Sequence, residues 1–212
     1  MPFGLRNSSG TFQRFFNNQL SGVQCTMAYL DDVLIFSRTV EDHKKDVHSV
    51  LSKLDAVGLK VNEAKCKFFQ DEIEFLGYNI TKNGIQPPQS RVEALSQLPE
   101  PKEKKETQRI LGMFGFYQRC IPSYASLALP LRMATRSENF EWTQLQSDAF
   151  SQLKESLKSA VQLSFPDRNG MLSITADASN VAIEACLNQS VGDEVKSLSF
   201  FSRKLTEHEK TP

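Results

Sequence analysis

Residues 23–36 read VQCTMAYLDDVLIF, and this stretch decides the expected fold of the first part of the chain. Two apolar runs, residues 23–29 and 33–36, lie on either side of the short link Leu30-Asp31-Asp32. Two strand-forming runs joined by a short polar link are typical of a β-hairpin. The pattern therefore predicts a hairpin that carries two adjacent carboxylates at its tip.

Adjacent carboxylates at a hairpin tip are suited to hold a divalent cation. Neighbouring side chains of a strand point to opposite faces, but at a turn both can lie near one site, where a cation offsets their repulsion. Mg²⁺ prefers hard oxygen ligands and usually takes one or two protein carboxylates together with substrate phosphates. Two such ions ~3.5–4 Å apart support nucleotidyl transfer. Because Asp is also common in ordinary solvated turns, Asp31 and Asp32 by themselves leave both interpretations open.

The composition is that of a globular protein with no strong charge bias. Of the 212 residues, 40% are hydrophobic and 24% are charged, and 25 basic residues balance 25 acidic ones. The lack of a basic field argues mildly against nucleic-acid binding, although a neutral total can contain a local basic stripe. The four cysteines form no C-x-x-C pair, which favours buried free thiols in a reducing compartment. With no apolar stretch of membrane-spanning length and no signal peptide, we expect a soluble intracellular protein, cytoplasmic or nuclear.

Apolar periodicity and breaker residues predict a mixed set of helices and strands. The expected helices cover residues 11–20, 39–57, 90–98 and 104–119, and another begins after Thr143. The expected strands, besides the hairpin, cover residues 60–69, 73–80, 172–174, 181–187 and 195–201. Thr39 is the expected N-cap of the second helix and Gly58 its stop, while Asn83-Gly84 marks a turn.

Further blocks occur in a fixed order along the chain. They are MPFGLRN (1–7), TFQR (11–14), GLKVN (58–62), KCKF (65–68), FLGY (75–78), YQR (117–119), FEWT (140–143), TADAS (175–179) and RKLT (203–206). Together with the YLDD hairpin, this series resembles the reverse transcriptases of gypsy-type long-terminal-repeat retrotransposons. The resemblance extends over essentially the whole chain.

This resemblance implies an α+β fold in three parts. Residues 1–80 would be a partial polymerase palm, residues 81–165 a mainly helical thumb and connection, and residues 166–212 the start of an α/β ribonuclease H-like domain. The implied function is RNA-directed DNA polymerase, as part of a Pol polyprotein whose parent also has ribonuclease H endonuclease activity. The alternative is a catalytically inactive remnant, or a module co-opted to bind nucleic acid or protein.

The resemblance also implies roles for individual residues. Asp31 and Asp32 would be catalytic and would bind Mg²⁺, with Mn²⁺ as a possible substitute, and Asp177 would be the first metal ligand of the nuclease. The nucleotide and template would be contacted by Phe3, Gly4, Gln13, Arg14, Tyr29 and Lys65. For Gln13 and Arg14 the alternative is a contact with the neighbouring helix, and for Lys65 it is a solvated surface position. The primer grip would be Phe75, Leu76 and Gly77.

The implied partners are an RNA or DNA template-primer, deoxynucleoside triphosphates and the remaining Pol segments, with no membrane. Four lysines either contact phosphates or form a solvated face: Lys102, Lys104, Lys105 and Lys154.

The chain departs from the family pattern in three places. The family's third palm carboxylate lies upstream of the Pro-Phe-Gly block, and its further nuclease ligands come after the position of Pro212. We therefore expect the isolated chain not to extend a primer. The family usually has Gly-x-Gly after the Asp-Ala-Ser block, where this chain has an apolar run that contains Glu184. A charge among apolar neighbours indicates relaxed selection or a divergent nuclease half.

Overall fold

The acidic stretch forms the predicted hairpin in the computed structural model, which describes residues 5–210. Strands β1 (Thr26–Tyr29) and β2 (Asp32–Ile35) are antiparallel, and Tyr29 pairs with Asp32. The loop is therefore only Leu30 and Asp31, one residue shorter than the predicted link. The difference arises because Asp32 is already paired with Tyr29 as the first residue of β2. Asp31 therefore lies in the loop and Asp32 in a strand.

Two helices support the hairpin in the first of two compact units, Met1–Gln70 and Asp71–Pro212. They are α1 (Ser8–Gln19) and α2 (Val40–Ala56). One apolar face of each helix packs in a small core whose buried members are Phe16, Leu20, Val50 and Leu54. Ala28 and Val33 of the hairpin pack against this core. Burial of these side chains supplies the main stabilisation of the hairpin, since a two-stranded ribbon alone is marginal in water.

The start and the end of α2 follow the sequence signals closely. The Thr39 hydroxyl accepts a hydrogen bond from the backbone N–H of Asp42 at 3.1 Å, which confirms the predicted cap. Gly58 follows the helix with a φ of 75°, a conformation that glycine adopts without steric cost. The strand predicted for residues 60–69 is wrong: its centre forms a short 3₁₀ helix, η1 (Glu63–Lys65), and both Phe68 and Phe69 are exposed.

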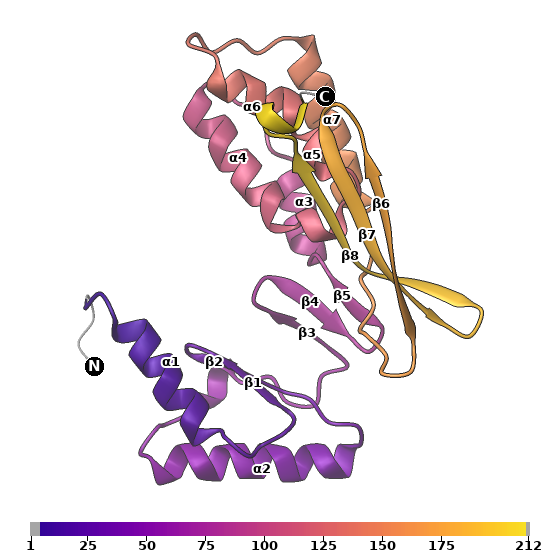
Figure 1. The fold of residues 1–212 in the computed structure, drawn as a ribbon. Coiled ribbons are helices and arrows are strands. Elements are labelled where there is room, and N and C mark those ends of the chain that lie inside the picture. Colours follow the sequence, from indigo (N-terminus) through magenta and orange to yellow (C-terminus); the bar gives the residue numbers. More distant parts are fainter. Residues whose placement is uncertain (1–4, 211–212) are drawn as a thin grey trace. The chain divides into compact units, whose positions relative to one another are not determined.

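The second unit begins with a three-stranded antiparallel meander. Its strands are β3 (Glu72–Phe75), β4 (Tyr78–Thr81) and β5 (Gly84–Gln86), in that order (Figure 1). The predicted single strand over 73–80 is thus a hairpin with a two-residue turn at Leu76-Gly77. The predicted turn at Asn83-Gly84 is confirmed, with Gly84 opening β5. Ile85 and Leu163 form an isolated bridge in which each backbone N–H donates to the other's carbonyl, at 2.8 and 2.9 Å.

A group of helices encloses the main core of this unit. They are α3 (Gln89–Ser96), α4 (Lys104–Phe116), α5 (Tyr124–Leu127), α6 (Leu129–Arg136) and α7 (Gln144–Lys158), with the 3₁₀ turn η2 (Gln118–Cys120) after α4. Phe114, Tyr124, Phe150 and Leu153 are almost completely buried between them. A capping box between Thr143 and Gln146 begins α7 as the sequence predicts.

The chain ends in a second antiparallel sheet that lies along this group of helices in Figure 1. Its strands are β6 (Met171–Ala178), β7 (Ala182–Val191) and β8 (Glu194–Lys204), followed by a short 3₁₀ turn, η3 (Glu207–Lys210). All three predicted strands are confirmed, and each is longer than its apolar run. Within residues 5–210, no helix is long and apolar enough to cross a membrane.

The predicted α+β class is confirmed. The limits of the two compact units can be compared with the predicted domain limits. The division of the structure falls after Gln70, ten residues before the predicted end of the palm region. The reason is that β3, β4 and β5 are fastened to α4 and to Leu163, all of which lie in the second unit. The predicted domain limits at 80 and 165 follow the order of the motifs along the chain and stay a prediction.

Candidate active site

The tip of the β1–β2 hairpin has an unusual backbone. Leu30 has a φ of 51°, in the left-handed region that a bulky L residue rarely occupies. Asp31 and Asp32 follow directly, and both are exposed. Tyr29, just before the turn, is also 53% exposed. The hairpin therefore exposes an aromatic ring and two carboxylates to solvent. The unfavourable φ of Leu30 between them requires stabilising contacts from the surrounding structure.

Gln13 of α1 makes the contacts that hold this turn. Its Oε1 accepts a hydrogen bond from the backbone N–H of Leu30 at 2.6 Å, and its Nε2 donates to the carbonyl of Ala28 at 2.9 Å. The same Nε2 donates to Oδ1 of Asn17 at 2.8 Å, one turn further along the helix. A single amide thus joins the end of β1 to the first residue of the turn. The partners expected for Gln13 were the template or the neighbouring helix, whereas its hydrogen bonds outside its own helix go to the hairpin.

The far end of β2 is also fastened to a helix. The Ser37 hydroxyl donates to Oδ2 of Asp46 on α2 at 2.6 Å and lies 3.3 Å from Nδ1 of His43. The His43 ring in turn meets the ring of Phe69 edge-on, with centroids 5.1 Å apart. The hairpin is therefore held at both ends, by α1 at its tip and by α2 where it leaves the sheet.

The remaining residues assigned to nucleotide and template lie at scattered positions. Arg14 is exposed on α1, where its guanidinium donates to the Thr11 hydroxyl at 3.3 Å. Lys65 is exposed at the end of η1. Phe3 and Gly4 lie outside the described residues. Among the predicted nucleotide-site residues that the structure describes, Gln13 and Tyr29 lie at the turn that carries the two aspartates.

The β3–β4 turn, predicted as a primer grip, has two residues with positive φ and a close contact with α4. Leu76 and Gly77 have φ values of 49° and 78°, as a tight two-residue hairpin turn requires. Phe75 is buried, whereas Leu76 is 40% exposed at the tip. A Cβ on Gly77 would lie 3.1 Å from Cε1 of Phe116, so glycine allows both the φ value and the close approach of α4.

Two tyrosines bind this turn to the end of α4. Tyr117 Oη donates to the carbonyl of Gly77 at 3.0 Å, and Tyr78 Oη donates to the carbonyl of Phe116 at 2.7 Å. The Tyr78 ring also stacks on the Phe116 ring at 5.2 Å between centroids. Burial raises the pKa of Tyr78 to about 12, and burial raises that of Tyr117 as well. Both phenols therefore stay protonated and keep donating through the neutral range.

Asp177, the predicted first nuclease ligand, is exposed near the end of β6. Its Oδ1 accepts the backbone N–H of Ala178 at 2.9 Å. Across the sheet it pairs with Glu184 of β7, which pairs in turn with Ser202 of β8. The three residues form a polar row across the sheet.

Glu184 has polar partners, so the expectation of purely apolar neighbours is wrong, while relaxed selection or a divergent nuclease half stays a prediction. Its two carboxylate oxygens accept hydrogen bonds from the hydroxyls of Ser123 and Ser126, at 2.5 and 2.8 Å. Nearby, the Ser202 hydroxyl accepts the backbone N–H of Ala125 at 2.9 Å. These bonds join the sheet to the start of α5. They link residues 58 to 77 positions apart, which is why no local pattern in the sequence indicated them.

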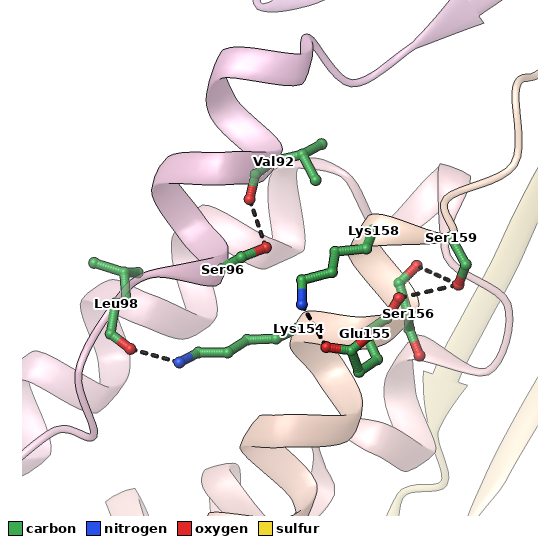
Figure 2. A network of polar contacts seen from close by, with 8 residues as sticks. All are labelled: Val92, Ser96, Leu98, Lys154, Glu155, Ser156, Lys158 and Ser159. Atoms are coloured by element: carbon green, nitrogen blue, oxygen red, sulfur yellow. Dashed lines mark hydrogen bonds and ion pairs between the residues drawn. The ribbon is translucent and has the colours of Figure 1, made fainter.

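Lys154 and Lys104 are two of the four lysines considered for phosphate contacts. Each donates a hydrogen bond to a backbone carbonyl within the second unit. Figure 2 shows Lys154 reaching from α7 to the carbonyl of Leu98, at 2.5 Å. Its Nζ also lies 4.2 Å from the centre of the Phe150 ring, and burial lowers its pKa. Lys104 donates to the carbonyl of Glu138 at 2.7 Å. Lys102 and Lys105 are exposed.

The donor set at the hairpin fits a hard divalent cation. Asp31 and Asp32 supply carboxylate oxygens, the ligand type and number that Mg²⁺ usually takes from a protein. Within residues 5–210, no group of three or more His, Cys, Asp or Glu side chains is arranged to enclose a metal ion. The residues of this hairpin that could hold such an ion are Asp31 and Asp32.

Family models match both ends of the chain. Residues 1–80 match the reverse transcriptase (RNA-dependent DNA polymerase) family, and residues 142–212 match the RNase H-like domain found in reverse transcriptase. The chain is 37% identical over 213 aligned residues to the Pol polyprotein of transposon 297 from Drosophila melanogaster. The chain belongs to the reverse transcriptase–ribonuclease H region of retrotransposon Pol polyproteins. The motifs quoted from the sequence thus identified the family correctly.

Other relatives place this reverse transcriptase region within larger proteins. The Tf2-3 polyprotein of Schizosaccharomyces pombe is 32% identical over 210 residues, which are 97% of this chain and 16% of that protein. For transposon 297 the shares are 99% and 20%. The chain therefore spans about a fifth or less of the length of these two curated relatives.

Solved structures of the foamy viral protease-reverse transcriptase share the fold. The form in complex with double-stranded DNA superposes with a TM-score of 0.88 at 25% identity, over 99% of this chain and 44% of that one. The form in complex with an RNA/DNA hybrid gives a TM-score of 0.88 at 24% identity, over 99% of this chain and 29% of that one.

Sequence reasoning missed the contacts that hold the reverse transcriptase motifs in place. Gln13 was selected, but for a contact with template rather than with the turn. Tyr78 and Tyr117 lay inside recognised blocks, yet their hydroxyl partners are backbone carbonyls about forty residues away. A backbone carbonyl has no residue-specific signal, so no pattern in the sequence could have indicated these pairs.

Proposed function

We propose that this chain supplies the palm, thumb and connection, with the start of the ribonuclease H domain, of an RNA-directed DNA polymerase from a gypsy-type retrotransposon. The observation that carries the proposal is the Tyr29-Leu30-Asp31-Asp32 hairpin, which holds two exposed carboxylates on a fixed turn. The family membership of the segment around it makes nucleotidyl transfer the chemistry that this arrangement serves.

In this proposal Asp31 and Asp32 hold Mg²⁺, which Mn²⁺ can replace. The bound ions would activate the primer 3′-hydroxyl and stabilise the leaving pyrophosphate. The residues of the chain contribute position and charge: the core under the hairpin fixes the strands, and the held turn keeps the carboxylates in place before substrate arrives. Preorganised charge of this kind is usually the largest contribution to such catalysis.

The nucleic acid would contact several of the remaining residues. Leu76, exposed at the tip of its turn, and Gly77 would touch the primer end, with Phe75 anchoring the turn from below. Tyr29 is exposed beside the carboxylates and would contact the incoming nucleotide or the template. Arg14 and Lys65 are exposed cations and would approach phosphates, and Phe3 and Gly4 keep their proposed place at the nucleotide. The foamy viral enzyme, solved with double-stranded DNA and with an RNA/DNA hybrid, supports a duplex as the partner.

Asp177 would be the first metal ligand of the ribonuclease H site. Its exposure at the end of β6 leaves its second carboxylate oxygen available, since the first accepts a backbone N–H. The remaining Pol segments would complete this site, as well as the palm. The parent protein would then be an endonuclease as well as a polymerase.

The metal site can be tested directly on the 212-residue chain. Mn²⁺ binding is measured by electron paramagnetic resonance for the unmodified chain and for Asp31→Asn, Asp32→Asn and Asp55→Asn. Asp55 is an exposed aspartate at the end of α2, so its variant is a matched control for the charge change. We expect either hairpin variant to weaken Mn²⁺ binding by about tenfold, because metal affinity follows the number of charged ligands. Equal binding by all four proteins would overturn the proposed metal site.

The catalytic part is tested by primer extension on RNA and DNA templates. The assay uses residues 1–212 alone and joined to the upstream catalytic strand that the family resemblance implies. We expect the joined protein to incorporate nucleotides and Asp31→Asn or Asp32→Asn to abolish incorporation, while the chain alone binds duplex without extending it. Duplex binding with no incorporation by the joined protein would instead support the non-catalytic binding module.

A further inference from the structure

Leu30 raises a physical question about the hairpin, because a leucine occupies the position where glycine, asparagine or aspartate is usual. Its φ of 51° is unfavourable for a bulky side chain, and the residue is next to the carboxylate pair. Left alone, this peptide would relax toward a negative φ, which would change the direction in which the chain enters Asp31. The surrounding structure must therefore supply a contact that depends on the positive φ.

The side chain of Gln13 supplies that contact through the end of β1 and the first residue of the turn. The Leu30 N–H can only donate and the Ala28 carbonyl can only accept, so the amide of Gln13 fits them in one orientation alone, at 2.6 and 2.9 Å. The bond from Nε2 to Asn17 limits rotation of the same amide about its last torsion. An amide fixed in this way defines the orientation of the Leu30 peptide.

The helix that carries Gln13 is itself immobilised. Phe16, one turn further along α1, is buried with Leu20 in the core that also contains Val50 and Leu54 of α2. The Phe12 ring, next to Gln13, stacks on the Phe16 ring with centroids 5.5 Å apart. Gln13 therefore connects the turn to the packed core of its unit rather than to another surface group.

We infer that Gln13 is a positioning residue for the metal-binding carboxylates, acting through the Leu30 peptide and not through template or nucleotide. The inference rests on the proposed function, since it assigns to Gln13 the task of presenting Asp31 and Asp32 to the metal. Gln13 is half-buried beneath the hairpin and both of its amide ends are used by backbone and Asn17. Its amide is therefore engaged before any nucleic acid binds.

The test compares one substitution at two positions of α1. Gln13→Met keeps the length and packing of the side chain but removes both hydrogen bonds to the turn. Gln19→Met, at the end of the same helix, is the matched control. We expect Gln13→Met to weaken Mn²⁺ binding by about tenfold, as is typical when a group that orients a metal ligand is removed, and Gln19→Met to leave it unchanged. Circular dichroism should show the same helix content in both variants.

A second substitution separates positioning from simple loss of stability. Asparagine tolerates a positive φ far better than leucine, so Leu30→Asn should recover most of the lost Mn²⁺ affinity in the Gln13→Met background. In the unmodified chain, the Leu30 amide should be protected from hydrogen exchange although it lies at a hairpin tip. This measurement needs no variant, so it remains decisive even if Gln13→Met fails to fold.

The outcomes distinguish this inference from the proposed function. If Asp31→Asn weakens Mn²⁺ binding but Gln13→Met does not, the metal site stands and the positioning role is wrong. If neither aspartate variant changes Mn²⁺ binding, the proposed function fails and the positioning role fails with it. An unprotected Leu30 amide, or a double variant no better than Gln13→Met alone, would also overturn the inference.

Discussion

Gly84 is the glycine at which an added methyl group should lower the stability of the protein most. A Cβ at this residue would overlap the carbonyl oxygen of Leu163 and would lie 2.9 Å from its carbonyl carbon and 3.1 Å from Cα of Ser164. These are backbone atoms, which cannot rotate aside as a flexible side chain can. The φ of Gly84 is 150°, which L residues rarely adopt, so Gly84→Ala carries backbone strain in addition to the overlap.

The expected loss of stability follows from the backbone strain at residue 84 and from the hydrogen bonds that must break to relieve the overlap. Strain at a glycine-only conformation costs about 1–3 kcal/mol. Relieving the overlap means moving Leu163 away from Ile85, and each of their two mutual backbone hydrogen bonds contributes about 0.5–1.5 kcal/mol. Because giving up the bonds relieves part of the strain, we expect Gly84→Ala to lower the free energy of unfolding by about 3–5 kcal/mol, a large part of a typical domain's stability.

Urea unfolding followed by fluorescence measures this change. Trp142 is the sole tryptophan of the sequence, and its ring packs edge-on against Phe150 in the core of the same unit, with centroids 6.1 Å apart. Gly112→Ala is the matched control: Gly112 lies within α4, and a Cβ there would meet nothing within 4 Å. We expect this control to raise the stability by about 0.5–1 kcal/mol, because alanine is the better helix former. A Gly84→Ala protein as stable as the unmodified chain would refute the reasoning.

Three further predictions concern contacts that hold the second unit together. Tyr117→Phe removes the hydrogen bond to the Gly77 carbonyl and should cost about 1 kcal/mol in the same urea assay; an unchanged midpoint would mean that this bond does not hold the β3–β4 turn. Glu184→Ala leaves Ser123 and Ser126 without their acceptor and should cost about 1–2 kcal/mol, whereas a charge tolerated through relaxed selection would cost nothing. Hydrogen bonds from Arg203 and Thr206 lower the pKa of Glu209 from the ordinary 4.5 to about 2, so the stability that its carboxylate contributes is complete above pH 4.5 and is lost as the pH falls toward 2. An NMR titration should show that pKa and its return toward 4.5 in Arg203→Gln; the same low value in both proteins would contradict the assigned cause.

Local signals in the sequence predicted local structure well. Thr39, Gly58 and Thr143 mark helix ends through contacts that span only a few residues, and each was found where the pattern placed it. The three C-terminal strands were also found, because a period of two over a long stretch is a strong signal. Such features depend on neighbours in the chain, which the sequence displays directly.

The strand predicted for residues 60–69 shows where local reasoning fails. The alternation of lysine and apolar residues around Cys66 imitates a half-buried strand. A strand also needs a partner for its backbone, and no partner can be read from residues 60–69 themselves. The structure instead places the 3₁₀ turn η1 there, and the Cys66 thiol contacts the carbonyl of Asn62 at 3.3 Å.

The candidate site divides in the same way. The aspartates and their turn could be found from the sequence because the chemistry lies in the residues themselves, whereas the β3–β4 turn was singled out only through the family resemblance, within a stretch predicted as one strand. The groups that hold those turns, Gln13, Tyr78 and Tyr117, reach backbone atoms 15 to 40 residues away. Their partners are peptide groups that every residue possesses, so only the fold could identify them.

The backbone links made by Leu163 and Ser164 limit which sequence changes this part of the chain can accept during evolution. Leu163 joins β5 through Ile85, and the next residue, Ser164, donates its backbone N–H to the carbonyl of Ser197 in β8 at 2.9 Å. Two successive residues thus belong to two different sheets, and both links use backbone atoms only. Such links are indifferent to the identity of Ser164 but sensitive to the number of residues between α7 and β6. We expect related elements to vary freely in sequence at residue 164 while tolerating almost no insertion or deletion there, because one extra residue would break the register of both sheets at once.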